Sequence, residues 1–453
     1  MQERIVVVGA GLAGSEAAWQ IARQGIGVEL FEMRPGQRTP AHATGGFAEL
    51  VCSNSLGSSL LDRPTGLLQE ELRRMGSLLM EVARSASVPA GGALAVDREQ
   101  FAEAVTRRLT NHPLIEIRRE RVDDWPAEGV GVIATGPLTA EQLSETMQQR
   151  LGECSLHFYD AMAPIVDAET LDTSICFRAS RYGRGEQEQG DYINCPMNRD
   201  EYERFVRELE TAGQVKRREF ERKDKKFFEA CLPVEELARR GERTLAFGPL
   251  RPKGLTDPRT GDRPYAVVQL RQDNAAGSLY NLVGFQTSLT YAEQDRVFRL
   301  IPGLATARFI RYGQMHRNTF LNAPRLLDAG LQLKTDQRIL MAGQLVGAEG
   351  YAGSIGTGLL AGINAVRHAR AQPPLVLPAE TMLGSLTRYL TSADSGTFQP
   401  MKANFGLLPP LVPPVRNKRD RQAAYSERAL EALTNTQNVP HAETSQLTCA
   451  KSI

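Results

Sequence analysis

Two cysteines occupy positions where a thiol could take part in covalent chemistry. Cys52 ends a loop rich in Gly, Ala and Thr, and Cys231 lies in the stretch Phe227–Pro233, just before a predicted helix. A thiolate is a strong nucleophile, and a helix N-terminus or a basic neighbourhood stabilises it. Seven Lys or Arg residues between Lys216 and Lys226 supply such a neighbourhood. The competing interpretations are a small buried side chain for each cysteine and a solvated helix face for the basic run.

A glycine-rich loop near the N-terminus is typical of a dinucleotide site. Gly9, Gly11 and Gly14 follow the apolar run Ile5–Val8 and precede a predicted helix. The first glycine permits a tight turn, the second lets a pyrophosphate approach the backbone, and the third lets helix and strand pack closely. We therefore assign the whole loop to a cofactor, including the residues between the glycines, which are Ala10, Leu12 and Ala13.

Two further features select among dinucleotides. Glu32 ends the next predicted strand, where a carboxylate can hydrogen-bond a ribose 2′-hydroxyl and repels a 2′-phosphate, so FAD or NAD is favoured over NADP. A second strand-turn-helix pattern comes late in the chain, with a strand at Arg338–Gly343, a turn at Ser354–Gly358 and a helix at Leu359–Ala369. Its helix N-terminus can face a second part of a long cofactor, which favours FAD and assigns Gly343 and Gly356 to it. The alternative is a close contact between helix and sheet that needs small residues.

The composition excludes several classes of protein. The 453 residues are 42% hydrophobic and 24% charged, as in soluble globular proteins, and the net charge of +1 neither favours nor excludes an anionic partner. We expect no membrane span, because no run of about 18 apolar residues occurs, and no signal peptide, because the chain enters its first strand directly. The six cysteines are scattered and the histidines lack ligand spacing. We therefore expect no metal site and a cytoplasmic location.

The predicted elements indicate an α/β protein. We expect a Rossmann-like FAD-binding domain, a parallel sheet with helices on both faces, and an inserted α+β domain. Val130–Gly136 is predicted to return the chain to the first sheet. The predicted divisions are 1–155 and 321–440 for the two parts of the FAD-binding domain, 156–320 for the insertion, and 441–453 for a disordered tail.

Finer patterns predict individual helices and caps. Apolar spacing predicts one helix over Gly66–Arg84, with a buried stripe formed by Leu68, Leu72, Met75, Leu79 and Val82. Asp97 followed by Gln100 resembles a helix cap. Alternating residues predict strands at Tyr265–Leu270 and Leu279–Phe285.

Several longer motifs resemble those of the TrmFO family, the folate- and FAD-dependent tRNA (uracil-5-)-methyltransferases. The resemblance extends from Ile5 to about Tyr425 and is far more specific than the glycine loop. Its marks are Val7–Ala18, Phe31–Pro35, Val51–Leu56, Val88–Arg98, Phe228–Glu235, Met315–Thr319 and Phe398–Met401.

This resemblance implies a reaction and roles for particular residues. Cys231 would add to C6 of a uracil, and Cys52 would act as general base beside the flavin, near which Tyr351 would pack. The implied partners are the T-arm of tRNA, methylenetetrahydrofolate as carbon donor, reduced FAD as hydride donor and NAD(P)H as its reductant, without an obligate protein partner. No tryptophan lies in the insertion, so a stacked folate or base would use Tyr280 or Phe285.

Four alternatives stay open at this point. A close relative could act on ribosomal RNA uridine with the same chemistry, and a GidA-like flavoprotein could modify a wobble uridine of tRNA. A flavin disulfide reductase is disfavoured because no closely spaced cysteine pair exists. The fourth alternative is a non-catalytic RNA-binding protein stabilised by FAD.

Overall fold

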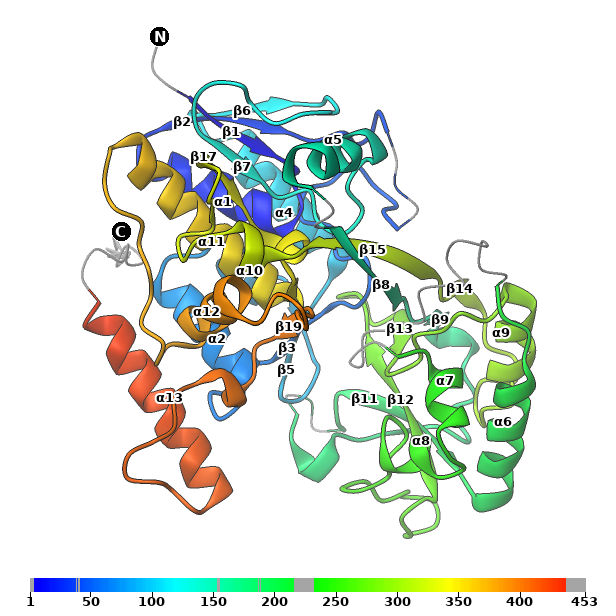
Figure 1. The fold of residues 1–453 in the computed structure, drawn as a ribbon. Coiled ribbons are helices and arrows are strands. Elements are labelled where there is room, and N and C mark those ends of the chain that lie inside the picture. Colours follow the sequence, from blue (N-terminus) through cyan, green and yellow to red (C-terminus); the bar gives the residue numbers. More distant parts are fainter. Residues whose placement is uncertain are drawn as a thin grey trace, which may run out of the picture.

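A computed structural model describes residues 4–37, 39, 41–152, 155–185, 187, 189–215 and 232–436. The chain forms two bodies, each with its own sheet and its own buried core. Figure 1 shows the two sheets apart from each other. Cys231 and the basic run Lys216–Lys226 lie outside the described residues. None of the described helices is long and apolar enough to cross a membrane.

The first body is built on a six-stranded sheet of mostly parallel strands. Its order is β16 (Gln332–Leu333), β17 (Asp336–Met341), β7 (Gly131–Ile133), β1 (Arg4–Val8), β2 (Gly27–Phe31) and β6 (Ile115–Arg118). Only β16 is antiparallel to its neighbour. Val8, the last residue of β1, is in register with Phe31 and with Ile133, so three strands end at one edge. The predicted return of the chain at Val130–Gly136 is thereby confirmed.

Two helices that are far apart in the sequence pack against each other beside this sheet. They are α1 (Leu12–Ala22) and α11 (Tyr351–Ala369). A Cβ at Gly358 would overlap the carbonyl of Ala13, so the helices approach through backbone contact. The second glycine-rich pattern therefore forms a turn and also the close contact between α11 and α1. Its helix begins at Tyr351, earlier than the sequence predicted, because the small residues Ala352, Gly353 and Ser354 in its first turn resemble a loop.

The predicted helix over Gly66–Arg84 is in fact two helices. α2 (Pro64–Arg74) and α3 (Leu78–Ser85) are separated at Gly76, whose φ of +77° ends the first helix. Ser77 then caps the second helix by accepting a hydrogen bond from the Met80 N–H. The predicted buried stripe is confirmed in all five members, which are Leu68, Leu72, Met75, Leu79 and Val82.

The remaining elements of the first body surround this centre. They include α4 (Arg98–Thr110), whose predicted cap Asp97 accepts from the Gln100 N–H, α5 (Glu141–Leu151), α10 (Ala323–Leu326), α12 (Met382–Ser392) and α13 (Lys418–Thr434). Short strands form a three-stranded sheet of β3 (Ser55–Ser58), β5 (Ala93–Val96) and β4 (Ser87–Val88), and a pair of β18 (Ala348–Glu349) and β19 (Met401–Lys402).

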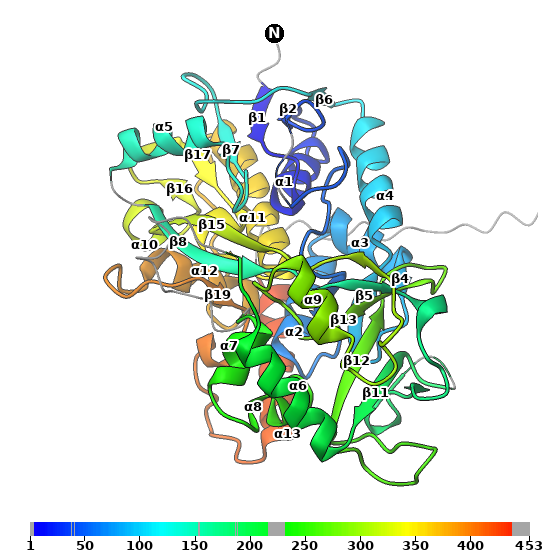
Figure 2. The same ribbon diagram turned by 90° about the vertical axis from the view of Figure 1, so that its right-hand side faces the viewer.

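The second body holds a six-stranded sheet with helices α6 (Arg199–Thr211), α7 (Val234–Arg239), α8 (Thr244–Phe247) and α9 (Tyr291–Phe298). The strand order is β10 (Phe177–Arg178), β11 (Tyr192–Met197), β12 (Ala266–Gln272), β13 (Leu279–Leu282), β9 (Ile165–Asp167) and β14 (Phe309–Arg311). The chain enters and leaves this body along an antiparallel pair, β8 (Ser155–Ala161) and β15 (Met315–Leu321), seen from two sides in Figures 1 and 2.

The core of the second body corrects one expectation. Tyr280 and Phe285, proposed above as stacking platforms, are fully buried among core side chains. The Phe285 ring packs against Phe205 and Phe298 instead of facing a ligand. The predicted α/β fold class is confirmed by the first sheet and its helices, while the division into residue ranges stays a prediction.

Candidate active site

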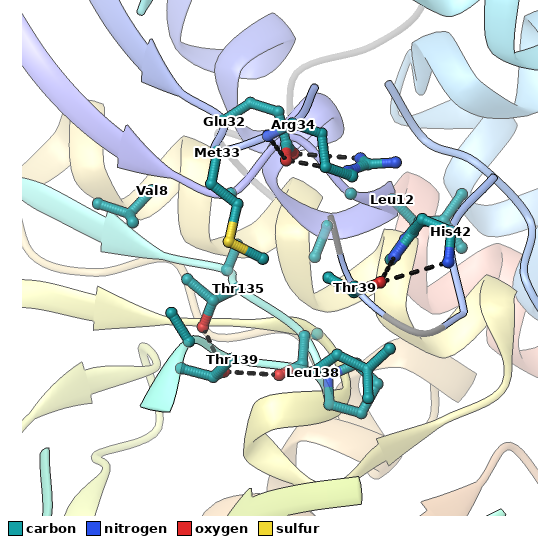
Figure 3. A pocket seen from close by; sticks show the side chains of 18 of the residues that line it. Val8, Leu12, Glu32, Met33, Arg34, Thr39, His42, Thr135, Leu138 and Thr139 are labelled. Carbon is teal, nitrogen blue, oxygen red and sulfur yellow. Dashed lines mark hydrogen bonds and ion pairs between the residues drawn. The ribbon is translucent and has the colours of Figure 1, made fainter. Parts of the chain in front are cut away.

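A pocket lies at the edge where β1, β2, β7 and β17 end. Its walls come from segments far apart in the sequence, as expected where parallel strands end beside one another. Figure 3 shows Glu32 and Arg34 on one side of the pocket and Thr135 and Thr139 on another. The predicted residues that line it are Gly9, Gly11, Leu12, Ala13, Glu32, Gly343 and Tyr351.

The glycine loop has the geometry that a pyrophosphate needs. Gly9 has a φ of +95°, and a Cβ there would lie 2.7 Å from the carbonyl oxygen of Ala134. A Cβ at Gly14 would overlap the Gly9 carbonyl, whereas one at Gly11 would meet nothing within 4 Å. Gly11 therefore leaves open space at the start of α1, a helix with no side-chain cap. The unpaired N–H groups of its first turn can bind phosphate oxygens.

Glu32 is held rigidly on the pocket wall. One carboxylate oxygen accepts from the N–H and Nε of Arg34, both at 3.0 Å, and the other accepts from the Ala10 N–H at 3.0 Å and from Arg34 Nη2 at 3.2 Å. Burial raises the pKa of Glu32, but its bonds to Arg34 outweigh burial and hold that pKa below its ordinary value. The carboxylate is thus ionised, and a ribose hydroxyl would share an oxygen with one of these donors.

The late glycine motif contributes only part of what the sequence assigned to it. Gly343 lines the pocket, and its N–H donates to Thr357 Oγ1 at 2.9 Å. Gly356 faces away from the pocket: a Cβ there would lie 2.8 Å from Leu383 Cδ1, on the helix that packs against the other side of α11. The absence of a Cβ at Gly356 therefore lets the two helices pack closely in this structure.

Tyr351 connects the pocket to Cys52. Its phenol oxygen accepts hydrogen bonds from the backbone N–H groups of Cys52, at 2.9 Å, and Ser53, at 3.0 Å. Burial raises the pKa of Tyr351 above its ordinary value, and the nearby Cys52 raises it further, so the phenol stays protonated. The first residue of α11 thereby fixes the cysteine-bearing loop next to the pocket. The roles that the resemblance implies for Cys52 and Tyr351 stay predictions.

Two arginines, Arg271 buried and Arg98 partly buried, reach the same loop from different bodies. Arg271, at the end of β12, donates from Nε to Asn54 Oδ1 at 2.9 Å and from Nη2 to Ser53 Oγ at 2.6 Å. Arg98, at the start of α4, donates to the Leu50 carbonyl at 2.8 Å and pairs with Asp273 at 3.1 Å. The loop around Cys52 is therefore a joint between the two bodies.

A third arginine, Arg311, adds a positive charge, and two of its hydrogen-bond donors have no acceptor among the described residues. Arg311 interacts electrostatically with Arg98, Asp273, Tyr351 and Cys52. Burial and then repulsion by Arg98 lower its pKa to about 10, so it remains a cation at neutral pH. Its buried Nε and Nη2 find no hydrogen-bond partner among the described residues. Buried donors are normally paired, so these two are suited to a ligand oxygen.

The sequence did not reveal this arginine cluster. Arg98 belongs to the Val88–Arg98 motif, where the local pattern indicates only the start of a helix. Arg271 and Arg311 lie in strands with no local mark of function. Among the described residues, no group of three or more His, Cys, Asp or Glu side chains is arranged to hold a metal ion.

The chain is similar to known proteins over most of its length. The family model of glucose inhibited division protein A matches residues 4–373. A protein of Desulfitobacterium hafniense (strain Y51) is 57% identical over 429 residues, which are 95% of this chain and 97% of the relative. A protein of Synechococcus elongatus is 54% identical over 446 residues, 96% of this chain and 95% of the relative. Both are named methylenetetrahydrofolate--tRNA-(uracil-5-)-methyltransferase TrmFO.

The chain belongs to the TrmFO family. The resemblance drawn from the sequence motifs is thereby confirmed. The crystal structure of Aquifex aeolicus GidA (form I) matches with a TM-score of 0.68 at 18% identity, covering 96% of this chain and 77% of that one. At that identity the match supports the fold alone, so this TrmFO-family chain shares its architecture with GidA.

Proposed function

We propose that this protein methylates C5 of the T-loop uridine of tRNA, with methylenetetrahydrofolate as carbon donor and reduced FAD as reductant. The observation that carries the proposal is the joint between Tyr351, at the end of the dinucleotide pocket, and the backbone of Cys52. This contact supports the proposal that the thiol of Cys52 acts beside the flavin. The name shared by relatives of 54% and 57% identity supports the same reaction.

The pocket residues fit FAD. The loop Gly9–Gly14 would hold the pyrophosphate, Glu32 the ribose, and Gly343 the region between pyrophosphate and flavin. Bound FAD supplies a hydride after reduction, for which we propose NAD(P)H as the source. We place the reaction in the cytoplasm, since the scattered cysteines suit a reducing compartment.

The chain's own residues supply the covalent and proton-transfer steps. The Cys231 thiolate forms a bond to C6 of the uracil, which makes C5 nucleophilic toward the one-carbon unit. Cys52 takes the C5 proton as the carbon–nitrogen bond to tetrahydrofolate breaks, which leaves a methylene group on C5. A hydride then adds to that methylene carbon and the S–C6 bond breaks, so Cys231 leaves as a thiolate and the product carries a methyl group. Cys231 lies outside the described residues, so its role rests on the family resemblance. The next described residues, from Leu232 into α7, are held by Glu235, which accepts from Thr287 and Ser288.

Negative charge that develops on the uracil oxygens needs stabilisation during these steps. The unpaired buried donors of Arg311 are suited to that task, because a fixed cation in a site shielded from water acts strongly on developing charge. Arg98 and Arg271 are already bonded to protein oxygens and position the Cys52 loop. We propose that Arg311 contacts the substrate and that the other two are positioning residues.

RNA with 5-fluorouridine at the target tests the two thiol roles. Fluorine at C5 cannot leave as a proton, so the adduct with the nucleophile persists and shifts the protein on a denaturing gel. Cys231→Ala should form no adduct, whereas Cys52→Ala should form it but lose at least about 100-fold in turnover on normal tRNA.

Two outcomes would contradict these roles. An adduct that survives in Cys231→Ala removes this residue as nucleophile. Normal methylation by Cys52→Ala, measured with labelled methylenetetrahydrofolate, excludes Cys52 as base. The flavin spectrum of each variant serves as the control for an intact cofactor site.

A further inference from the structure

An open groove lies on the insertion body, between α8 and the start of β12. We call it the α8 groove, and its lining consists of Arg243, Ala246, Phe247, Arg251, Pro252, Lys253, Arg263, Pro264 and Tyr265. No acidic side chain is part of this lining, whose nine residues all belong to the described chain. Figure 1 shows α8 and β12 in the body opposite the first sheet.

The groove has walls fixed by backbone contacts. Tyr202, buried in the core, donates from its hydroxyl to the Glu242 carbonyl at 2.8 Å and accepts from the Ala246 N–H at 3.2 Å. On the other side, the Val267 N–H donates to the Leu250 carbonyl at 2.9 Å. These bonds hold the turn before α8 and the start of β12 in place, so the groove is preorganised.

Four exposed cations of the groove have no acidic partner. Arg243, Arg251, Lys253 and Arg263 make no ion pair with any carboxylate that the structure describes. The nearby Arg259 shows the contrast, because it pairs with Asp257 at 2.6 Å. Unpaired cations gathered in one hollow produce a positive potential that attracts a polyanion.

An exposed aromatic side chain accompanies the cations. Phe247 is 65% exposed, and the guanidinium of Arg243 lies over its ring at 4.9 Å from the ring centre. An exposed phenylalanine in a cationic groove offers a face on which a nucleic-acid base can stack, while the arginines and lysine bind phosphates. A simple phosphate site would need no such apolar surface.

The groove is connected to the Cys52 loop by a single strand. β12 begins at Ala266 beside the groove and ends at Gln272, next to the Arg271 that binds Asn54 and Ser53. Six residue steps along a strand cover about 20 Å, roughly six nucleotide steps. A ligand that fills the groove while its target reaches Cys52 must therefore be a chain of several nucleotides.

We propose that the α8 groove binds the phosphodiester backbone of the RNA substrate, several nucleotides away from the uridine that is modified. This inference rests on the proposed function and adds to it the surface that holds the RNA. The groove binds without reading sequence, because its cations face phosphates and one aromatic face accepts any base.

The test compares variants that each lose three cations. Arg243→Gln/Arg251→Gln/Lys253→Gln removes them from the groove, and Lys418→Gln/Arg419→Gln/Arg421→Gln removes exposed ones from α13. Binding of unmodified tRNA transcript is measured across a range of salt concentrations. We expect the groove variant to bind about tenfold more weakly at ~0.1 M salt, with a log–log salt slope shallower by about 2, because each lost phosphate contact removes 0.7–0.9 from the slope.

The control variant should bind as the wild type does. Equal affinity and slope for the groove variant and the wild type would overturn the groove as an RNA site. Wild-type protein that binds no tRNA would overturn the proposed function as well. If the triple variant of the groove lost its flavin, the double variant Arg251→Gln/Arg263→Gln would repeat the test. Its log–log salt slope is expected to be shallower than that of the wild type by about 1.5.

Discussion

At the scale of single residues, the candidate site is defined by how its polar groups are paired. Glu32, Arg98 and Arg271 are buried or nearly so, and each is bonded to protein atoms in fixed geometry. Arg311 differs, because two of its buried donors find no acceptor among the described residues. A native site retains such an unpaired cation when a ligand completes its bonding. This contrast separates a residue that touches substrate from those that hold the loop.

Replacing Arg311 should therefore affect catalysis more than stability. Arg311→Gln is expected to lower kcat/KM for tRNA methylation by about 10- to 100-fold, the value of one or two charge-assisted hydrogen bonds. Steady-state rates and thermal unfolding of holoenzyme provide the measurement. Arg308→Gln, an exposed neighbour paired with Asp167, is the matched control and should leave both unchanged. If Arg308→Gln lost activity while Arg311→Gln did not, the assignment of Arg311 as the residue that touches substrate would be refuted.

At the scale of elements, the cofactor pocket depends on the contact between α1 and α11. Both helices begin at the pocket, and their backbones touch where Gly358 meets Ala13. Gly362 repeats the contact one turn later, since a Cβ there would lie 2.7 Å from the Ala17 carbonyl oxygen. This close packing sets the position of the glycine loop relative to Gly343 and Tyr351, and hence the width of the pocket.

Adding one methyl group at this contact should weaken both fold and cofactor binding. Gly358→Ala is expected to lose about 1–3 kcal/mol of unfolding free energy, because its Cβ overlaps backbone that cannot move aside. Gly353→Ala, in the same helix, would bring its Cβ to 3.4 Å from Leu386 Cδ2 and 4.0 Å from Ala348, which is ordinary contact, and should be tolerated. Urea unfolding and the amount of bound flavin distinguish the two variants. Equal behaviour would show that the helices can separate without harm.

At the scale of the whole molecule, the Cys52 loop joins two bodies with separate cores. Asn54 is fully buried there and donates to the carbonyls of Val96, at 3.0 Å, and Gln272, at 2.8 Å. Its own oxygen accepts from Arg271. The side chain of Asn54 thus bridges the small sheet of the first body and the last residue of β12. If the target uridine contacts Cys52, as proposed, this bridge fixes the second body relative to the residue that it contacts.

Removing this bridge should disturb stability and catalysis together. Asn54→Ala leaves two carbonyls and one guanidinium N–H unpaired in the interior, so we expect a loss of about 3 kcal/mol in unfolding free energy and a lower kcat. Asn198→Ala removes only the exposed cap of α6 and should cost about 1 kcal/mol without changing kcat. Unfolding curves and turnover of both variants test the prediction. An unchanged kcat in Asn54→Ala would mean that the bridge is not needed for catalysis.

The sequence by itself determined the dinucleotide-binding core. The spacing of Gly9, Gly11 and Gly14 between an apolar strand and a helix permits few other structures, because each glycine answers a local steric demand. The buried stripe from Leu68 to Val82 was likewise readable from its period, although the break at Gly76 was not. Local chemistry and local periodicity are properties of neighbouring residues, so a sequence shows them directly.

Only the tertiary structure decided which distant residues meet around Cys52. Tyr351 lies 299 positions along the chain from Cys52, and Arg271 lies 217 from Asn54, yet they are in hydrogen-bond contact. Tyr280 and Phe285 resembled ligand platforms in the sequence but belong to a core, since burial depends on what the whole fold places against them. Arg311 has no motif at all, and its unpaired donors follow from the packing of two bodies around one loop. Spatial convergence is a global property, which no local pattern encodes.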